Sequence, residues 1–594
     1  MIDGVCMHDE HFRRSVYFQV LRTWTMSTVA HPLPILLVAL ITACSDAPSP
    51  ATLPVAKDPL GCGPVLTDDK AWYSSGERQP LFAGLDGLHY PITTKSDSAQ
   101  RYFDQGLVLA YGFNHAEAAR SFWEAARIDS TCAMAWWGFA YVLGPNYNAG
   151  MEPDSYARAY EAVGKAQGLS AACTEKEKGL IAAMALRYSA EAPDDRSALD
   201  KAYCEALRAL TAKHPDDADI AAMFAESLMD QHPWDLWEKD GKEKPWTPEI
   251  IAALERSMKN FPTHFGAHHL YIHAVEASRT PDRALPSAAF LENAVPGSGH
   301  LTHMPSHIYI RTGRYHEGVL ANQRSVAVDS GYTAMCHAAG AYPLAYFPHN
   351  IHFLSACATM EGNSAVAWRS ALDLRAHLAS ELFNDPGWST LQHYHGFPYF
   401  VAVKLGLWDE LASEPRPDST WKYATALWHY GQSRLSLHSG DLASGRQHLA
   451  DLKVLAADSA VSTVLVWGIN SAPMILAVGI ELLEGELLLA EGKEDEGIAH
   501  LNAAVVAEDA LQYQEPPDWA FPARHELGEA LLKAKRYAEA EAIFRADLIN
   551  WPENGFALDG LKKALAGAGK NAEADALTER ISRALAHADR SAAL

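Results

Sequence analysis

Several motifs that would point directly to a reaction are missing from this 594-residue sequence. Its eight cysteines form no C-x-x-C pair and no C-x-x-C-H motif, which disfavours thioredoxin-like redox chemistry and c-type haem. The chain also has no P-loop, no G-x-G-x-x-G turn, no H-E-x-x-H motif and no G-x-S-x-G elbow. Kinases, Rossmann enzymes, zincins and serine hydrolases are therefore disfavoured.

Basic residues are in short supply. The chain has 49 lysines and arginines against 73 acidic residues, which leaves a formal net charge of −24. A polyanion of this size repels phosphate backbones, so we expect no nucleic-acid partner. Hydrophobic residues make up 48% of the chain and charged residues 21%, a balance typical of a soluble protein that forms a core. The length allows about four domains of roughly 150 residues, unless repeats account for it.

Long apolar runs are scarce as well. The run from Leu33 to Ile41 is nine residues long, too short for a helix to cross a bilayer core of roughly 30 Å. It has the length of a signal-peptide core and ends in Ile41-Thr42-Ala43-Cys44, which resembles the bacterial lipoprotein signal. In that signal the cysteine is lipidated and becomes the first mature residue. The resemblance therefore implies a lipid on Cys44.

The lipoprotein resemblance divides the chain into three parts. Residues 1–43 are the expected signal peptide, residues 44–98 are the lipidated cysteine with a proline-rich tether and N-terminal segment, and the rest is a folded domain. The tether is inferred from the four prolines between Ser45 and Pro59. We expect a protein of the bacterial cell envelope that faces the periplasm and is anchored to a membrane by its lipid. An uncleaved anchor is the alternative.

From about Ala99 onward the sequence is a series of amphipathic helices, in which small and bulky residues recur at a fixed spacing. Near the C-terminus the spacings are 12, 4 and 8 residues, and one alanine follows another after 34 residues. The positions that fit the frame are Gly106, Ala118, Phe122 and Ala125; Gly485, Gly497, Leu501 and Ala504; and Gly528, Ala540, Phe544, Pro552 and Ala574. Small residues let two helices approach closely, while a bulky residue fills the groove between them.

This pattern resembles the tetratricopeptide repeat (TPR), in which each unit is a pair of antiparallel helices. The resemblance spans residues 99–590 and implies an all-α fold, a TPR-like α-solenoid of roughly ten or more repeats. The chain is similar to bacterial TPR lipoproteins, which implies the fold and no particular reaction. In TPR proteins the first helix of each unit faces a concave groove, where ligands are usually held.

Histidine is the residue that is unexpectedly abundant. Fourteen of the 27 histidines lie in the stretch 264–395, at the centre of the expected solenoid. Four consecutive units can be aligned on the residue that closes their first helix, namely Arg279, Gly313, Gly362 and Gly406. Histidines stand six residues before this turn in two units, ten before it in three, and thirteen before it in three. In chain order they are His269, His273, His300, His303, His307, His349, His352 and His393.

These three positions lie within an arc of about 60° on a helix, so the eight side chains share one face. Neighbouring first helices pack roughly 8–10 Å apart, close enough for their imidazoles to meet at a metal ion. We predict copper or zinc, because imidazole suits these metals better than magnesium or calcium. Six imidazoles suffice for two three-histidine sites, which suit paired copper ions with oxygen chemistry, or hydrolytic zinc. The favoured six are His269, His273, His303, His307, His349 and His352.

Nearby residues add detail to this site. Pro305 and Pro348 suit a first helical turn, where a missing N–H costs nothing. Their positions would put His300 and His303 on the loop before a helix. Glu276 is a candidate carboxylate ligand or catalytic general base, with a solvated surface acid as the alternative. The protein would then be a copper-dependent oxidoreductase, a zinc hydrolase or a metal carrier.

A second hypothesis is a metal-free adaptor whose groove holds a peptide or another envelope protein, as most TPR proteins do. The 16 tryptophans, 23 tyrosines and 19 phenylalanines suit pocket walls or peptide contacts equally well. An insertion at residues 232–246 with three tryptophans is expected to pack over something, or to be a plain loop. Cys336 and Cys357 lie near the histidines, where soft ligation, a disulfide and inert packing are all open.

Overall fold

The structure is a computed structural model that describes residues 70–151, 155–335, 338 and 340–589. All of these residues belong to one compact unit of the chain, residues 62–594. The expected signal peptide, Cys44 and the tether lie outside the described residues. Within the described ranges, none of the helices combines the length and the hydrophobicity that crossing a bilayer requires.

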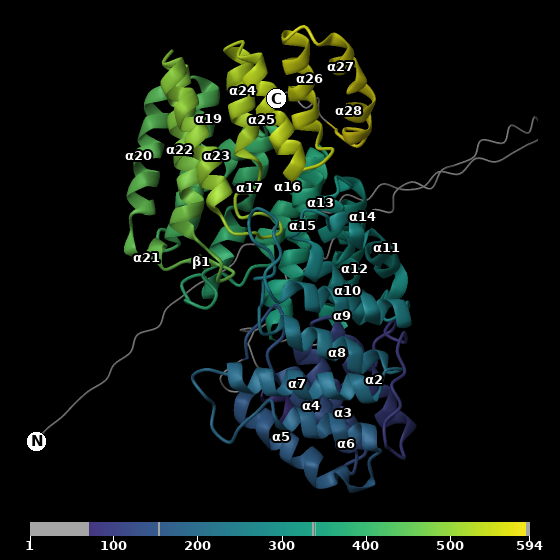
Figure 1. The fold of residues 1–594 in the computed structure, drawn as a ribbon. Helices are drawn as coiled ribbons and strands as arrows, with labels where there is room; N and C mark the ends of the chain where they lie inside the picture. The colour runs from purple at the N-terminus through teal and green to yellow at the C-terminus, as the bar shows by residue number, and fades with distance from the viewer. Residues whose placement is uncertain (1–69, 152–154, 336–337, 339, 590–594) are drawn as a thin grey trace, which may run out of the picture. The chain divides into compact units, whose positions relative to one another are not determined.

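Helices follow one another along almost the whole described chain (Figure 1). The earlier ones are α1 (Trp72–Ser75), α2 (Asp97–Tyr111), α3 (His115–Ile128), α4 (Ala133–Leu143), α5 (Ser155–Leu169), η1 (Ser170–Ala172), α6 (Glu175–Ala185), α7 (Ser197–Lys213), α8 (Ala218–Met229), α9 (Thr247–Asn260), α10 (Phe265–Val275), η2 (Pro281–Ala284), α11 (Leu285–Ala294), α12 (Gly299–His303), α13 (Pro305–Arg311) and α14 (Tyr315–Met335).

The later elements begin with a π-helical turn and include one short antiparallel hairpin, β1 with β2. They are η3 (Tyr342–Tyr346), α15 (Phe347–Met360), α16 (Ser364–Ala376), η4 (Ser380–Leu382), α17 (Leu391–Leu405), α18 (Trp408–Ser413), α19 (Lys422–Ser439), α20 (Leu442–Ala456), α21 (Ser459–Ser462), β1 (Leu465–Val466), β2 (Asn470–Ser471), α22 (Ala472–Ala490), α23 (Glu494–Ala510), α24 (Ala523–Lys533), α25 (Tyr537–Asn550), α26 (Gly555–Gly567), α27 (Asn571–Ala576) and α28 (Thr578–Ala584).

Successive helices pack as antiparallel pairs, and a phenylalanine marks the place where one pair meets the next. Phe122 of α3 is fully buried between α2 and α4. A Cβ atom at Gly106 of α2 would come within 2.8 Å of its ring, and one at Gly138 of α4 within 2.4 Å. Only glycine leaves room for the ring at both positions, so these residue types set the close approach of three helices.

The same wedge recurs near the C-terminus. Phe544 of α25 lies between Gly528 of α24 and Gly560 of α26, where added Cβ atoms would come within 2.3 and 2.2 Å of its ring. In both places the glycines stand sixteen residues before and after the phenylalanine (106, 122, 138 and 528, 544, 560). The predicted all-α, TPR-like solenoid of antiparallel helix pairs is confirmed.

The segment before the first repeat is part of the folded unit. The Phe82 N–H donates to Gln105 Oε1 at 2.8 Å, and Gln79 Nε2 donates to Glu117 Oε1 at 2.6 Å. These bonds attach the segment to α2 and α3. The solenoid itself begins at Asp97, two residues before the expected start.

The four units that carry the histidine pattern have the predicted phase. Their first helices are α10, α12 with α13, α15 and α17, and each ends shortly before the residue used for the alignment. Three of those residues, Gly313, Gly362 and Gly406, have φ values of 74°, 79° and 64°, a left-handed conformation that favours glycine. Pro305 begins α13 and Pro348 lies in the first turn of α15, as predicted.

The prediction that His300 and His303 lie on a loop is wrong, because both lie on α12. Ser298 caps this short helix, since its hydroxyl accepts from the Leu301 N–H at 3.4 Å. Pro305 has no N–H with which to continue the hydrogen-bond ladder, so the first helix of this unit is divided into α12 and α13.

Candidate metal centre

Six of the eight predicted histidines meet in two groups of three. In each group, one ring nitrogen from every histidine lies within 4.8 Å of the other two. The first triad is His269 and His273 of α10 with His300 of α12; the second triad is His303 of α12, His307 of α13 and His349 of α15.

The repeat register explains both triads. Each takes two histidines four residues apart, at ten and six positions before one turn, and a third at thirteen positions before the next turn. Each triad is therefore formed by the first helices of two successive repeat units. The Nε2 atoms of His269 and His300 are 3.1 Å apart, and those of His303 and His307 are 2.9 Å apart.

Hydrogen bonds outside the first triad decide which nitrogens carry protons. His269 Nδ1 lies 2.7 Å from the Tyr111 carbonyl oxygen, which can only accept, so this Nδ1 is protonated. His273 Nδ1 donates to Glu276 Oε1 at 2.9 Å. The Nε2 atoms of His269 and His273 are therefore unprotonated, and each presents a lone pair. Among the described residues, the buried His273 Nε2 and His300 Nδ1 have no hydrogen-bond partner.

The second triad shows the same arrangement. His303 Nδ1 lies 2.6 Å from Asn322 Oδ1, and the amide is oriented because its Nδ2 donates to a helix carbonyl at 2.8 Å. His307 Nδ1 donates to Glu515 Oε2 at 3.0 Å and forms an ion pair with Glu276 Oε2 at 2.5 Å. With both Nδ1 atoms protonated, the two Nε2 atoms at 2.9 Å would be facing lone pairs unless a proton or a metal ion lies between them.

Two buried carboxylates connect the triads. One oxygen of Glu276 accepts a hydrogen bond from His273, and the other forms an ion pair with His307. Burial alone would raise the pKa of Glu276, but the His307 and His273 imidazoles outweigh it and lower the pKa to about 2. Burial raises the pKa of Glu515 to about 7, against the hydrogen bond from His307. The site thus holds a firmly ionised carboxylate shared by both triads.

Burial also lowers the pKa of five of the six imidazoles, those of His269, His273, His300, His303 and His349. A neutral imidazole is the form that binds a metal. The sixth, His307, differs: burial lowers its pKa, but Glu276 and Glu515 outweigh burial and raise the pKa to about 9.

One phenylalanine covers each triad. The Phe113 ring centre lies 4.5 to 5.8 Å from the three rings of the first triad. Phe353 lies 4.5 to 5.2 Å from the three rings of the second triad. Phe113 has a φ of 54°, which is rare for a bulky residue and is the kind of strain that collects at functional sites. Both triads are therefore bounded by an apolar wall.

A cleft of about 1030 Å³ reaches the first triad. Its walls include the tryptophan-rich insertion at residues 232–246 and the loop at residues 511–519, and His273 and Glu276 lie in its lining. Trp234 meets His273 edge to face, with ring centres 5.6 Å apart. The insertion therefore packs over the histidine site and is not a plain loop.

The two remaining candidates, His352 and His393, lie apart from the triads. They stand in the same register, ten and thirteen positions before their turns, but Ala356 occupies the position six before the turn. We call His352, Ala356 and His393 the incomplete third set. Its two rings are 6.4 Å apart. Both ring nitrogens of His352 and the Nε2 of His393 are buried without a partner among the described residues.

Two histidines outside the register, His264 at the start of α10 and His268 within it, have structural roles. His264 Nδ1 accepts from the Ala267 N–H at 3.1 Å and so caps α10. His268 is held by a serine hydroxyl at 2.8 Å and a backbone carbonyl at 3.0 Å. Cys357 is free and buried, which leaves it the packing role, and Cys336 lies outside the described residues.

The residues that orient the imidazoles were missed in the sequence. Tyr111 contributes its backbone carbonyl, which no residue type signals. Asn322 belongs to the second helix of its unit, and Glu515 lies 208 residues from His307. Glu276 was found, but it is fully buried and bonded to two imidazoles, so it is not a solvated surface acid.

Comparison with known proteins adds little beyond the fold. No family model matches the chain, and no curated protein matches it significantly. Among solved structures it is similar to the human IFIT1 dimer with m7Gppp-AAAA at 14% identity, covering 84% of this chain and 92% of that chain with a TM-score of 0.30. The APC/C hetero-tetramer Cut9–Hcn1 matches at 13% identity, 85% and 79% coverage and a TM-score of 0.28. Scores this low bear on neither the ligand nor the partners of this chain.

Proposed function

We propose that this protein binds two transition-metal ions, copper or zinc, one in each histidine triad, and that this paired centre is its functional site. The Nδ1 partners identify Nε2 as the ligand atom of His269, His273, His303 and His307. Partners of this kind are what orient metal-binding imidazoles and raise their basicity.

The contact between His303 Nε2 and His307 Nε2 carries the proposal. Two ligand nitrogens of one ion, each about 2.0 Å from it, are separated by roughly 3 Å. The observed separation of the two Nε2 atoms is 2.9 Å. In both imidazoles, Nδ1 already donates a hydrogen bond to another residue. Two lone pairs at this distance would repel, and either a metal ion or a proton between the two atoms makes the contact favourable.

A proton is the competing occupant. A proton on His307 Nε2 would bridge to His303, but it would satisfy the second triad alone. In the first triad, His269 and His273 both aim lone pairs inward, and His300 can give only one N–H. One lone pair then remains buried and unmatched. A metal ion satisfies both triads in the same way, which favours the metal.

The donor set and the cleft indicate the class of chemistry. Three imidazoles per ion favour copper or zinc over magnesium or calcium. The lining of the cleft includes His273, so a small molecule can approach the first triad. Copper would supply oxygen chemistry there, and zinc would supply hydrolysis. Glu276 is engaged by two imidazoles, so its proposed role is to position ligands rather than to act as a free base.

Elemental analysis of the full chain, purified without an affinity His-tag, tests this function. We expect about two equivalents of copper or zinc in the parent protein. His307→Ala should remove the ion of the second triad, and His269→Ala the ion of the first. His500→Ala is the matched control, because His500 lies on α23, is partly exposed and pairs with Glu481.

Two outcomes contradict the proposal. The first is less than one equivalent of metal in the parent protein after incubation with copper or zinc salts. The second is equal loss of metal in His500→Ala and His307→Ala, which would locate the bound metal on surface histidines.

A metal-free adaptor is the second candidate function. The TPR-like fold supports it, as does a further cavity of about 1110 Å³ between the later helices, large enough for part of a peptide. It predicts negligible metal in the parent protein and in every variant. It also predicts that adding a chelator does not change the thermal stability of the protein.

We also propose that a lipid on Cys44 anchors the protein to a membrane of the bacterial envelope, facing the periplasm. The support is the tetrapeptide that ends in Cys44 and the short apolar run before it. Cys44→Ser should move the protein from the membrane fraction to the soluble fraction. A variant that still sediments with membranes would show that the anchor lies elsewhere.

A further inference from the structure

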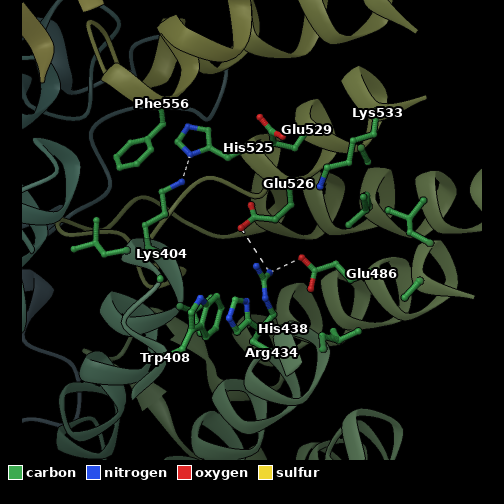
Figure 2. A pocket seen from close by; sticks show the side chains of 18 of the residues that line it. Lys404, Trp408, Arg434, His438, Glu486, His525, Glu526, Glu529, Lys533 and Phe556 are labelled. Atoms are coloured by element: carbon green, nitrogen blue, oxygen red, sulfur yellow. Dashed lines mark hydrogen bonds and ion pairs between the residues drawn. The ribbon is translucent and has the colours of Figure 1, made fainter. Parts of the chain in front are cut away.

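The cavity of about 1110 Å³ between α17, α19, α22, α24 and α26 is lined by none of the triad histidines. Figure 2 shows its charged side chains. Arg434 lies between Glu486, at 2.6 Å, and Glu526, at 3.7 Å, so these charges largely compensate one another. Two lysines, Lys404 and Lys533, also line the cavity.

Lys404 is the first member of a hydrogen-bonded chain of three side chains. Its Nζ lies 2.5 Å from His525 Nδ1, and His525 Nε2 lies 3.0 Å from Asp547 Oδ2 (Figure 2 shows the first contact). The carboxylate accepts from Nε2, so His525 Nδ1 is unprotonated and its lone pair is directed at the lysine nitrogen. His525 and Asp547 are both 1% exposed. The order amine, imidazole, carboxylate is that of an activated nucleophile.

The surroundings of Lys404 differ from those of a structural lysine. Among the described residues, the hydrogen bond of its Nζ goes to the His525 imidazole, and no carboxylate lies within ion-pair distance of it. Its Nζ instead lies 4.2 Å from the centre of the Phe556 ring. Burial lowers the pKa of Lys404. The charged and titratable groups that face it are His525, Glu526 and Glu529 of α24, Arg434 of α19 and Asp547 of α25.

We propose that Lys404 is a nucleophilic amine that captures an aldehyde or ketone as an imine in this cavity, with His525 as its base. The proposal is independent of the metal centre. It rests on the aligned three-residue chain, on the cavity that the lysine lines, and on the absence of an ion-pair partner in the described part of the chain.

The chemical step balances without a further reagent. The Lys404 amine attacks the carbonyl carbon, a C–N bond forms, and the carbonyl π electrons move to oxygen. His525 takes one proton from the nitrogen and returns it to that oxygen, while Asp547 stabilises the imidazolium in between. The carbinolamine then loses its hydroxyl and the remaining nitrogen proton as water, and the C=N bond forms.

The walls of the cavity indicate the class of carbonyl compound. Trp408 stacks on His438 with ring centres 4.4 Å apart, and Leu501 and Phe556 add further apolar surface. Arg434 is occupied by its two glutamates, so it is not available to bind a carboxylate. We therefore infer an aldehyde or ketone that bears an aromatic or apolar group.

Reductive trapping tests the proposal on the full chain. The protein is treated with benzaldehyde and cyanoborohydride at pH 7, and each labelled lysine is quantified by peptide mapping. We expect Lys404 to be labelled at least about tenfold faster than Lys533, which lines the same cavity. Equal labelling of the two lysines in the parent protein would overturn the proposal, and this comparison needs no variant.

A variant separates activation from mere exposure. His525→Gln removes the base, so labelling of Lys404 at pH 7 should fall at least about tenfold and recover at higher pH. Labelling of Lys533 should stay constant. Unchanged Lys404 labelling in a folded His525→Gln protein would contradict the role of the histidine. His307→Ala should label as the parent does, so this result and the metal result are separable.

Discussion

The two complete triads and the incomplete third set occupy equivalent positions of successive repeats, yet they differ in how many imidazoles converge. Each triad has three imidazoles whose nitrogens converge. In the third set, Ala356 stands where His273 and His307 stand in the other two units. His352 there has no hydrogen-bond partner for either ring nitrogen within the described chain.

The comparison separates what the repeat supplies from what the site supplies. The repeat register alone brings histidines from adjacent first helices near one another, and it does so in all three places. In the triads, four imidazoles have an Nδ1 partner: the Tyr111 carbonyl, the Asn322 amide and the two carboxylates Glu276 and Glu515. In the third set, His393 Nδ1 meets the Tyr423 hydroxyl at 2.9 Å, while His352 has no partner among the described residues. Within the described chain, the third set therefore has no carboxylate or carbonyl to orient its imidazoles.

The largest expected effect comes from giving the first triad the composition of the third set. His273→Ala does this, because it places alanine six residues before the turn. Two imidazoles remain, too few to retain the ion, so the metal content should fall from about two equivalents to about one. Elemental analysis after gel filtration measures it. Two retained equivalents would show that His273 is not a ligand.

A smaller effect is expected from the carboxylate that connects the triads. Glu276→Gln removes the charge that faces His273 and His307. Loss of a side chain that orients a metal-binding histidine lowers metal affinity about 10–100-fold. Competition with a chelator should show weaker binding at both triads. Glu515→Gln is the matched control, since Glu515 contacts His307 alone among the triad histidines and should weaken one site. Equal effects of the two variants would contradict the bridging role.

The smallest effect is expected in the third set itself. His352→Leu replaces a buried imidazole that lacks partners with an apolar side chain of similar size. The free energy of unfolding should stay the same or rise by about 1 kcal/mol, because two unsatisfied nitrogens are removed. Metal content should not change. Denaturant titration and elemental analysis measure these two quantities, and a loss of metal would show that His352 binds an ion after all.

Much of the fold could be predicted because the same spacing of small and bulky residues recurs in several repeats. Gly106 with Phe122 and Gly528 with Phe544 already defined a small-to-bulky contact between helices, and the structure shows those contacts. The shared helix face of the histidines also followed from spacing alone. The Ser298 cap of α12 was missed, because Pro305 suggested that the helix began there.

The rest of the site depended on information that spacing does not carry. A triad needs two histidines from one unit and one from the next, and only packed helices reveal that division. His300 therefore belongs to a triad while His352 does not. Glu515 comes from a distant loop, and Phe113 covers three imidazoles from two other units. Contacts of this range are set by tertiary packing, which leaves no local pattern.

The division of each triad between two units has a mechanical consequence. A solenoid deforms mainly at the interfaces between its units, since each unit contacts only its neighbours. The first triad joins α10 to α12, the second joins α12 and α13 to α15, and Glu276 ties one triad to the other. Ions bound there would cross-link three consecutive units at two points. This stretch of the solenoid would then be stiff, while the repeats on either side remain elastic.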